Sequence, residues 1–200
     1  GDVDGGTYGL ESDGDLKYNP STGKVTATGF IGDISGGTGL TDSQMPAGSV
    51  LQVIQASFGG VQTMATSQTW TDISSLSAAI TPSNSSNKVL AVFSINTSSA
   101  ENQRGGLRIV RGSTAIGIAD AQSNRTLAST ILVGIPSALH TSNSSHSVLD
   151  SPSTTSETTY KVQMWMENTS DLHINRARTY TDQNTYTAAV STLTLYEIQG

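Results

Sequence analysis

Short runs of alternating apolar and polar residues recur along this chain, and the periodicity of an amphipathic helix is not sustained anywhere. Period-two runs rich in β-branched and aromatic residues are typical of strands. We therefore expect low helix content and eight principal strands. The runs are Ser49–Ser57, Val61–Trp70, Asn87–Thr97, Leu107–Val110, Thr114–Ala119, Thr130–Ile135, Thr158–Glu167 and Ser191–Ile198.

Between these runs lie stretches rich in Ser, Asn, Gly and Pro, which favour turns: Thr81–Ser86, Ser98–Gly106, Thr141–Ser147 and Ser151–Ser156. Many short strands separated by such turns indicate an all-β fold. The sequence therefore predicts an antiparallel, jelly-roll-like sandwich over residues 49–200.

The alternation assigns faces in two of the expected strands. In Thr158–Glu167, Tyr160 and every second residue to Met166 share one apolar face, while Trp165 interrupts the polar face. We expect the apolar face to pack in the core and Trp165 to pack elsewhere. In the last strand, Leu193, Leu195 and Ile198 are set against Thr192, Thr194 and Glu197, which predicts a core or subunit-interface strand.

Residues 1–48 differ in character, because Asp and Gly are concentrated there and apolar residues are sparse. Two short strands, Leu16–Tyr18 and Lys24–Phe30, are joined by the turn Asn19–Gly23, and residues 36–41 form a linker. Since a lone hairpin is marginal in water, an ordered stem needs strands from other copies of the chain. We predict a trimerising fibre stem over residues 1–48 and a head over residues 49–200.

Composition excludes several classes of function. The net charge is −6 and the sequence has no cysteine, so neither a phosphate-binding surface nor thiolate chemistry is expected. We expect no nucleic-acid partner and, without a long apolar run, no membrane insertion. The solvating groups are neutral, with 29 serines and 27 threonines.

The stem resembles a short element that recurs in bacteriophage tail-fibre and related virion proteins. The match rests on Tyr18–Gly23 together with Ala27–Thr28 and Phe30–Gly32. In those fibres the element implies a homotrimeric shaft.

The head resembles domains at the ends of phage structural proteins, notably from viruses of marine and cyanobacterial hosts. That resemblance implies a trimeric head at a fibre tip or virion projection, located on the virion, with other virion proteins as partners. The matching segments are Gly48–Val53, Ile80–Pro82, Lys88–Leu90, Leu149–Pro152, Thr159–Gln163 and Ser191–Ile198.

Candidate metal and catalytic motifs do not match their templates. The Asp-rich opening lacks EF-hand spacing, and Ser21–Val25 lacks the glycine and hydroxyl residue of a phosphate-binding loop. His140 and His146 lie near Asp150, but no nucleophile elbow accompanies them. The three histidines lack zinc-site spacing. We expect no catalytic residue, no metal and no cofactor.

Binding residues are expected in the segment Asn168–Thr187, which gathers arginine, tyrosine and histidine among small polar residues. Tyrosine and arginine offer rigid contact area and bidentate hydrogen bonds. The alternative is an ordinary long loop whose arginines pair with acidic neighbours. A second candidate, with the same alternative, is Glu101–Arg104 with Arg108. The candidate ligand-binding residues are His173, Arg176, Arg178, Tyr180, Tyr186 and Arg104.

Three functions fit this sequence. The first is attachment of a virion fibre tip to a host surface glycan or protein, without catalysis and with avidity from several copies. The second is a purely architectural head that registers and caps a trimeric fibre. The third is a polysaccharide depolymerase, which needs a pair of carboxylates. No spacing in the sequence pairs the available ones, Asp120, Asp150, Glu157, Glu167 and Asp182.

Overall fold

The computed structural model divides into two compact units, Gly1–Leu40 and Thr41–Gly200, which we describe separately. The Asp-rich opening, Phe30–Gly32 and most of the expected linker lie outside the described residues. The division into a stem of residues 1–48 and a head of residues 49–200 stays a prediction. The described residues are 16–27, 41, 44–64, 66–132, 134, 137–168, 172–181 and 183–200.

In the first unit, β1 (Leu16–Asn19) and β2 (Lys24–Ala27) form an antiparallel hairpin. The side-chain oxygen of Asn19 accepts a hydrogen bond from the Ser21 amide at 3.0 Å, which fixes the turn, and Gly23 supplies a positive φ of 66°. Tyr18 and Val25 pair across the strands with 60% and 48% of their surfaces exposed. Local turn chemistry therefore defines this hairpin.

The described residues of the second unit contain strands and no α-helix. All of their strand pairs are antiparallel, which confirms the all-β, antiparallel prediction. The strands are β3 (Val50–Phe58), β4 (Gln62–Thr63), β5 (Thr71–Ile80), β6 (Lys88–Ser99), β7 (Gly105–Arg111), β8 (Thr114–Ile116), β9 (Thr130–Leu132), β10 (Ser142–Asp150), β11 (Thr158–Met166), β12 (Leu172–Ile174) and β13 (Ser191–Ile198).

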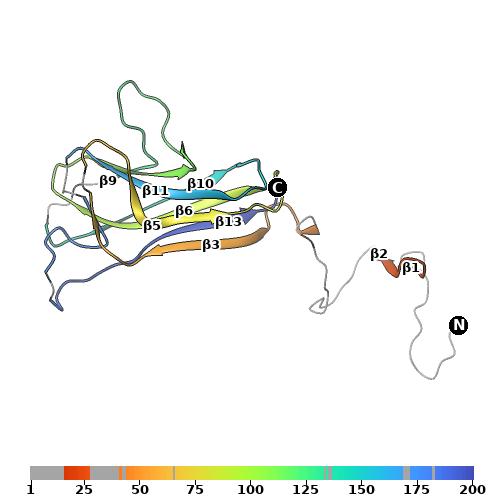
Figure 1. The fold of residues 1–200 in the computed structure, drawn as a ribbon. Helices are drawn as coiled ribbons and strands as arrows, with labels where there is room; N and C mark the ends of the chain where they lie inside the picture. The colour runs from red at the N-terminus through yellow and green to blue at the C-terminus, as the bar shows by residue number, and fades with distance from the viewer. Residues whose placement is uncertain are drawn as a thin grey trace. The chain divides into compact units, whose positions relative to one another are not determined.

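These strands form two sheets (Figure 1). In the first, β6 has β10 on one edge and both β13 and β12 on the other, and these pair in turn with β3 and β4. In the second, the order is β5, β11, β7 and β8, and β9 also pairs with β7. We call them the β6 sheet and the β11 sheet.

One hydrophobic cluster lies between the sheets and draws on both. In β11, Tyr160, Val162, Met164 and Met166 are fully buried, as the alternation predicts. Because burying each such side chain contributes about 1.5–3 kcal/mol relative to exposure, these inward rows fix the register of the strands. Trp165 lies on the opposite, outer face of the β11 sheet.

At the end of the terminal strand β13, the side chains that face the core are not the expected ones. Leu193 and Leu195 are fully buried as expected, but Glu197 is only 1% exposed and continues the inward row, whereas Ile198 is half-buried. The apolar character of Ile198 therefore predicted the wrong face. A shift in the pairing with β3 falls between Glu197 and Ile198.

The alternation does not predict three of the strands, and two expected strands, Val61–Trp70 and Thr114–Ala119, are shorter than predicted. β5 breaks its alternation at a bulge, where Ser75 has a φ of 60° and the pairing with β11 shifts. β10 and β12 fall in segments that we had predicted to be turn or loop. Of the expected strand Val61–Trp70, only β4 forms. Within the part of the chain that the structure describes, no helix is long and apolar enough to span a membrane.

Candidate functional site

Most of the predicted binding residues lie in the segment 176–190. This segment, which we call the excursion, connects β12 to β13, and both of these strands pair with the same edge of β6. β12 pairs with Thr97–Ser99 of β6, and β13 pairs with Lys88–Ser94 along the same edge. The chain leaves this edge after Asn175 and returns to it at Ser191. The predicted long loop is therefore shorter than expected, because β12 occupies part of it.

Asn175 and Ser191 close the base of this excursion, and both are fully buried. The Ser191 hydroxyl donates to the side-chain oxygen of Asn175 at 2.6 Å, and the Asn175 amide donates to the carbonyls of Phe58 and Gly60 at 2.6 and 2.9 Å. Asn175 also adopts a φ of 62°, which asparagine tolerates better than most residues. These hydrogen bonds hold both ends of the excursion, Asn175 and Ser191, in a fixed position.

His173 and Arg176 belong to that base. His173 is 5% exposed, and its Nδ1 lies 2.9 Å from both the Thr63 hydroxyl and the Arg176 guanidinium. Arg176 can only donate, so Nδ1 of His173 is an acceptor. Arg176 also donates to the Thr63 hydroxyl at 2.9 Å. These side chains link β12 to β4.

The remaining predicted residues of the segment lie on the excursion itself. Tyr180 is 43% exposed, and the Arg176 guanidinium lies 5.7 Å from its ring centroid. The carbonyl of Arg178 accepts a hydrogen bond from Arg176 at 3.4 Å. The structure thus brings His173, Arg176, Arg178 and Tyr180 together. Their role in binding a ligand stays a prediction.

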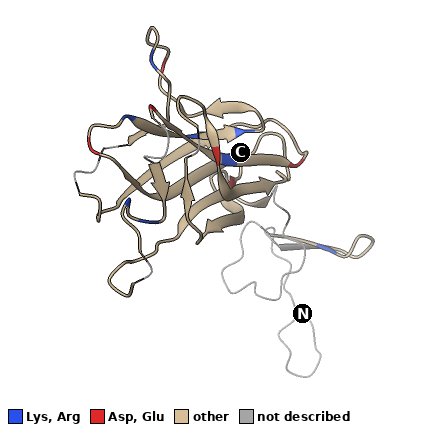
Figure 2. Ribbon diagram, turned by 60° about the vertical axis from the view of Figure 1, so that its left-hand side comes forward, with Lys and Arg blue, Asp and Glu red and all other residues tan. Residues whose placement is uncertain are grey.

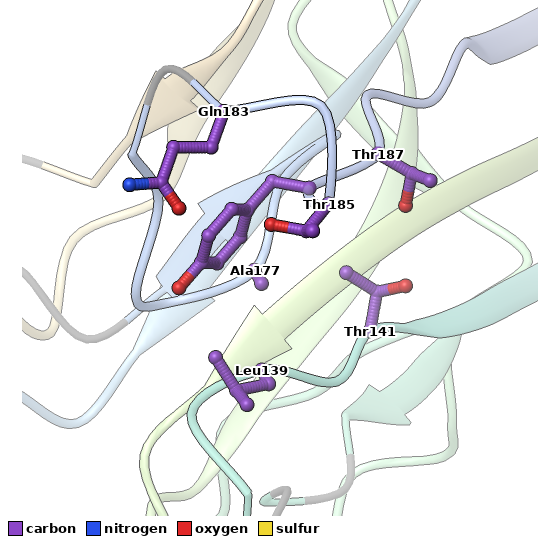
Figure 3. A pocket seen from close by; sticks show the side chains of 7 residues that line it. Leu139, Thr141, Ala177, Gln183, Thr185 and Thr187 are labelled. Carbon is purple, nitrogen blue, oxygen red and sulfur yellow. The ribbon is translucent and has the colours of Figure 1, made fainter.

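Tyr186 lines a separate cavity of about 230 Å³, which we call the loop cavity. In Figure 3, Leu139 and Thr141 lie on one side of it and Gln183, Thr185 and Thr187 on the other. The lining is mostly hydroxyls and an amide.

Arg104 lies in a different place, at a cavity of about 370 Å³ that contains both tryptophans of the chain. We call it the tryptophan cavity. Trp165 is directly paired with Gly106 of β7, which is paired with Ile131 of β9. The cavity therefore opens on the outer face of the β11 sheet. Its lining is Trp70, Arg104, Gly105, Gly106, Arg125, Thr126, Ala128, Ile131 and Trp165.

One wall of the tryptophan cavity comes from the segment between β8 and β9, residues 117–129, which projects from the body of the unit (Figure 1). The Ala119 amide donates to the Ala128 carbonyl at 3.2 Å, and the Ser129 amide donates to the Leu107 carbonyl at 2.9 Å. The first bond closes the base of the projecting segment, and the second ties that base to β7. Arg125 donates to the Gln122 side chain at 2.8 Å.

Gly106 is required where it stands. A Cβ at this position would lie 2.9 Å from the Cβ of Ala128 and 3.7 Å from the ring of Trp70. Any side chain would therefore push Ala128, and with it the base of the projecting segment, away from β7. The buried glycine lets this segment pack closely against the sheet beside the cavity.

Trp70 is held by a chain of polar contacts. The Arg108 guanidinium lies 4.2 Å from the Trp70 ring centroid, a cation–π geometry, and donates to Gln163 at 2.9 Å. Gln163 and Lys161 both donate to Asp72, at 2.6 and 2.7 Å. Burial acts to raise the pKa of Asp72, but these donors outweigh it and the pKa lies below its usual value.

The charge of the tryptophan cavity is opposite to that of the chain. Among the described residues that line it, Arg104 and Arg125 are charged and none is acidic, while the chain carries −6. Figure 2 shows how few and scattered the charged residues are. Arg104 pairs with Glu167 at 3.3 Å but is 81% exposed, so this ion pair holds it only weakly.

Sequence reasoning found Arg104 and Arg108 but missed the tryptophans beside them. Trp70 and Trp165 are far apart in the chain, and only the pairing of β11, β7 and β9 brings Trp165 near residues of the projecting segment. The signal in the sequence was Trp165 itself, a large aromatic residue on an otherwise polar strand face.

The residues weighed for a catalytic triad have other partners. Asp150 accepts hydrogen bonds from Arg111 at 2.8 Å and from the Tyr160 hydroxyl at 2.7 Å. Burial and the bond to Asp150 raise the pKa of Tyr160. The His146 ring lies 6.2 Å from that of Phe93 in β6. Within the described ranges, no group of three or more His, Asp or Glu side chains could hold a metal ion.

Comparison with protein families and with curated proteins gives no match for this chain.

Proposed function

We propose that this protein is the head of a virion fibre or surface projection and that it binds a receptor on the host cell, a glycan or a protein, without covalent chemistry. The head would be trimeric and joined to other virion proteins through its stem. The proposal combines the resemblance of residues 18–32 to fibre shafts with the site geometry of the head.

The order of the strands supports a jelly-roll-like head. When the short strands β4, β9 and β12 are left aside, the chain alternates between the sheets except at the β7–β8 hairpin. The strands β10, β6, β13 and β3 then form one four-strand order, and β8, β7, β11 and β5 form the other. Jelly rolls have eight strands in this double Greek-key arrangement and occur in viral capsid and lectin domains. Because fold alone does not decide function, the site must carry the argument.

The observation that carries the proposal is the tryptophan cavity. Two indole rings and two arginines surround an open space of about 370 Å³, within the ~300–1,000 Å³ range of ligand sites. Tryptophan and arginine dominate the energetics of recognition surfaces. Glycoside hydrolysis needs a pair of carboxyl groups, and the described lining contains none. The cavity is therefore suited to binding.

The outer face of the β6 sheet supports the trimer. Leu149, Leu90, Tyr196 and Val53 form one row across its four strands. Leu149 and Val53 are 53% and 52% exposed. This row is uncharged, so copies of the chain can meet there without desolvating a charge. The hairpin, marginal alone, gains partner strands in the same assembly.

Competition for host cells tests the proposal. We expect the isolated protein, added to host cells before infection, to reduce adsorption of the virus in a dose-dependent way. Failure to compete, with a folded trimer in solution, would leave the architectural head as the better account. Release of reducing ends from host polysaccharide would instead favour the depolymerase.

A further inference from the structure

We propose that the tryptophan cavity binds a carboxylate-bearing sugar of the host surface, an inference that rests on the proposed attachment function. Three features of the cavity support this: its aromatic walls, its cations and its apolar rim at Ile131.

The aromatic walls suit a sugar ring. Trp165 stands on the outer face of β11, and Trp70 lies where the ring would touch a side chain added at Gly106. Indole rings offer large rigid faces at low entropic cost, with an N–H donor at one edge. The apolar face of a pyranose can lie against such a ring while its hydroxyls remain solvated.

The cations select the charge of that sugar. Arg104 and Arg125 contribute to the lining, and Arg108 lies behind the Trp70 ring. A guanidinium presents paired donors that match a carboxylate. Since the described lining has no acidic side chain, the anion that a bound carboxylate must displace from Arg104 is Glu167. Glu167, the partner of Arg104, lies outside the lining. Because this ion pair is exposed, a bound carboxylate can replace Glu167 at little cost in free energy.

The rim at Ile131 extends the surface of the cavity onto β9. Gly106 forms part of the lining and is paired with Trp165 on one strand and Ile131 on the other, and Ile131 is 79% exposed. Ile131 therefore leaves an apolar surface beside the tryptophans at the edge of the cavity. An extended saccharide can therefore enter the cavity with one residue and continue over Ile131.

Tryptophan fluorescence tests the site directly, because both tryptophans of the chain line this cavity. The full chain is titrated with oligogalacturonate and, as a matched control, with its uncharged methyl ester. We expect the acid to change the emission with saturation and the ester to bind at least about tenfold more weakly. A glycan array should show acidic glycans bound in preference to neutral ones.

Variants locate the binding. Trp165→Phe should weaken binding of the acid and leave Trp70 as the reporting fluorophore. Arg104→Gln with Arg125→Gln should lower affinity for the acid by about 10-fold to 100-fold, as expected for lost hydrogen bonds to a charged group, with little effect on the ester. Lys88→Gln, which removes an exposed cation on β6 of the other sheet, is the matched control and should bind as the parent does. Far-ultraviolet circular dichroism checks that each variant folds.

Several outcomes would overturn the assignment: unchanged emission with no acidic glycan bound on the array, equal binding of acid and ester, tighter binding of single-stranded DNA, or full affinity in the arginine variant. The competition assay separates this failure from that of the proposed function. If the protein blocks adsorption and the Trp165→Phe protein blocks it equally well, attachment stands and this site does not. If the acid binds but adsorption is not blocked, the site stands and attachment does not.

Discussion

Single buried polar residues hold turns of the head against its strands. Glu197 is the clearest case, a carboxylate 1% exposed with no cation as a hydrogen-bond partner. One of its oxygens accepts hydrogen bonds from the Ser83 amide at 2.7 Å, the Ser83 hydroxyl at 2.8 Å and the Asn87 amide at 2.6 Å, and the other accepts from Gln52. It thereby fastens the turn after β5 to the last strand.

The acid sensitivity of Glu197 can be predicted. Burial acts to raise the pKa of Glu197, but its donors outweigh burial and the pKa lies below its ordinary value of 4.5. A depressed folded pKa means that the stabilisation is complete above the unfolded pKa and is lost as pH falls through the folded one. Glu197→Gln places an amide against buried donors and should lower the free energy of unfolding by about 1–3 kcal/mol at pH 7.

Urea unfolding from pH 7 to pH 3 checks this prediction. The difference between parent and Glu197→Gln should shrink below about pH 4.5, because the unfolded parent then binds a proton that the folded state, with its lower pKa, takes up only at lower pH. The matched control is Glu157→Gln, an exposed residue, which should change stability by less than about 0.5 kcal/mol. A constant difference at all pH values would contradict the assigned charge of Glu197.

At the scale of elements, the regular strand pattern is interrupted at two places, the bulge in β5 and the connection between β12 and β13. The bulge at Ser75 allows Ile73 and Leu76 both to reach the core. The excursion after β12 leaves and rejoins one strand line at Asn175 and Ser191. In both places a non-glycine residue adopts a positive φ, a local cost of about 1–3 kcal/mol that the surrounding hydrogen bonds must offset.

Substitutions at Asn175 separate these contributions. Asn175→Gly removes the three side-chain hydrogen bonds but keeps the backbone conformation at low cost. Asn175→Ala removes the same bonds and adds the left-handed penalty. We expect both variants to be destabilised and the alanine variant to be the less stable by about 1–2 kcal/mol. Chemical denaturation measures the pair, and equal stabilities would show that the backbone relaxes away from its positive φ.

At the scale of the whole molecule, the two outer faces of the head differ. The β11 sheet exposes the tryptophan cavity and its polar supports, whereas the β6 sheet exposes the row from Leu149 to Val53. We assign the first face to a ligand and the second to other copies of the chain. A trimer then presents three cavities, and weak single sites combine through avidity.

Light scattering tests the assembly, with an expected mass of three times 20.8 kDa. Leu149→Lys places a charge in the apolar row and should yield the monomer, with the strand pairing intact by circular dichroism. Ser145→Lys is the matched control, because Ser145 is exposed on the same strand and the same face, four residues away. A monomeric parent protein, or trimers in both variants, would refute this interface.

The sequence by itself determined the all-β class, the inward rows of β11 and most of β13, and the hairpin turn at Asn19, because side-chain alternation and turn chemistry are local properties. It did not reveal β5, β10 or β12, whose polarity or bulges imitate loops and whose pairing partners are distant in the chain. It also favoured the segment 168–187, where His173 and Arg176 turn out to tie strands together. Only the tertiary structure brought Trp70, Trp165 and the arginines around one cavity, because cross-strand register decides which outward side chains become neighbours.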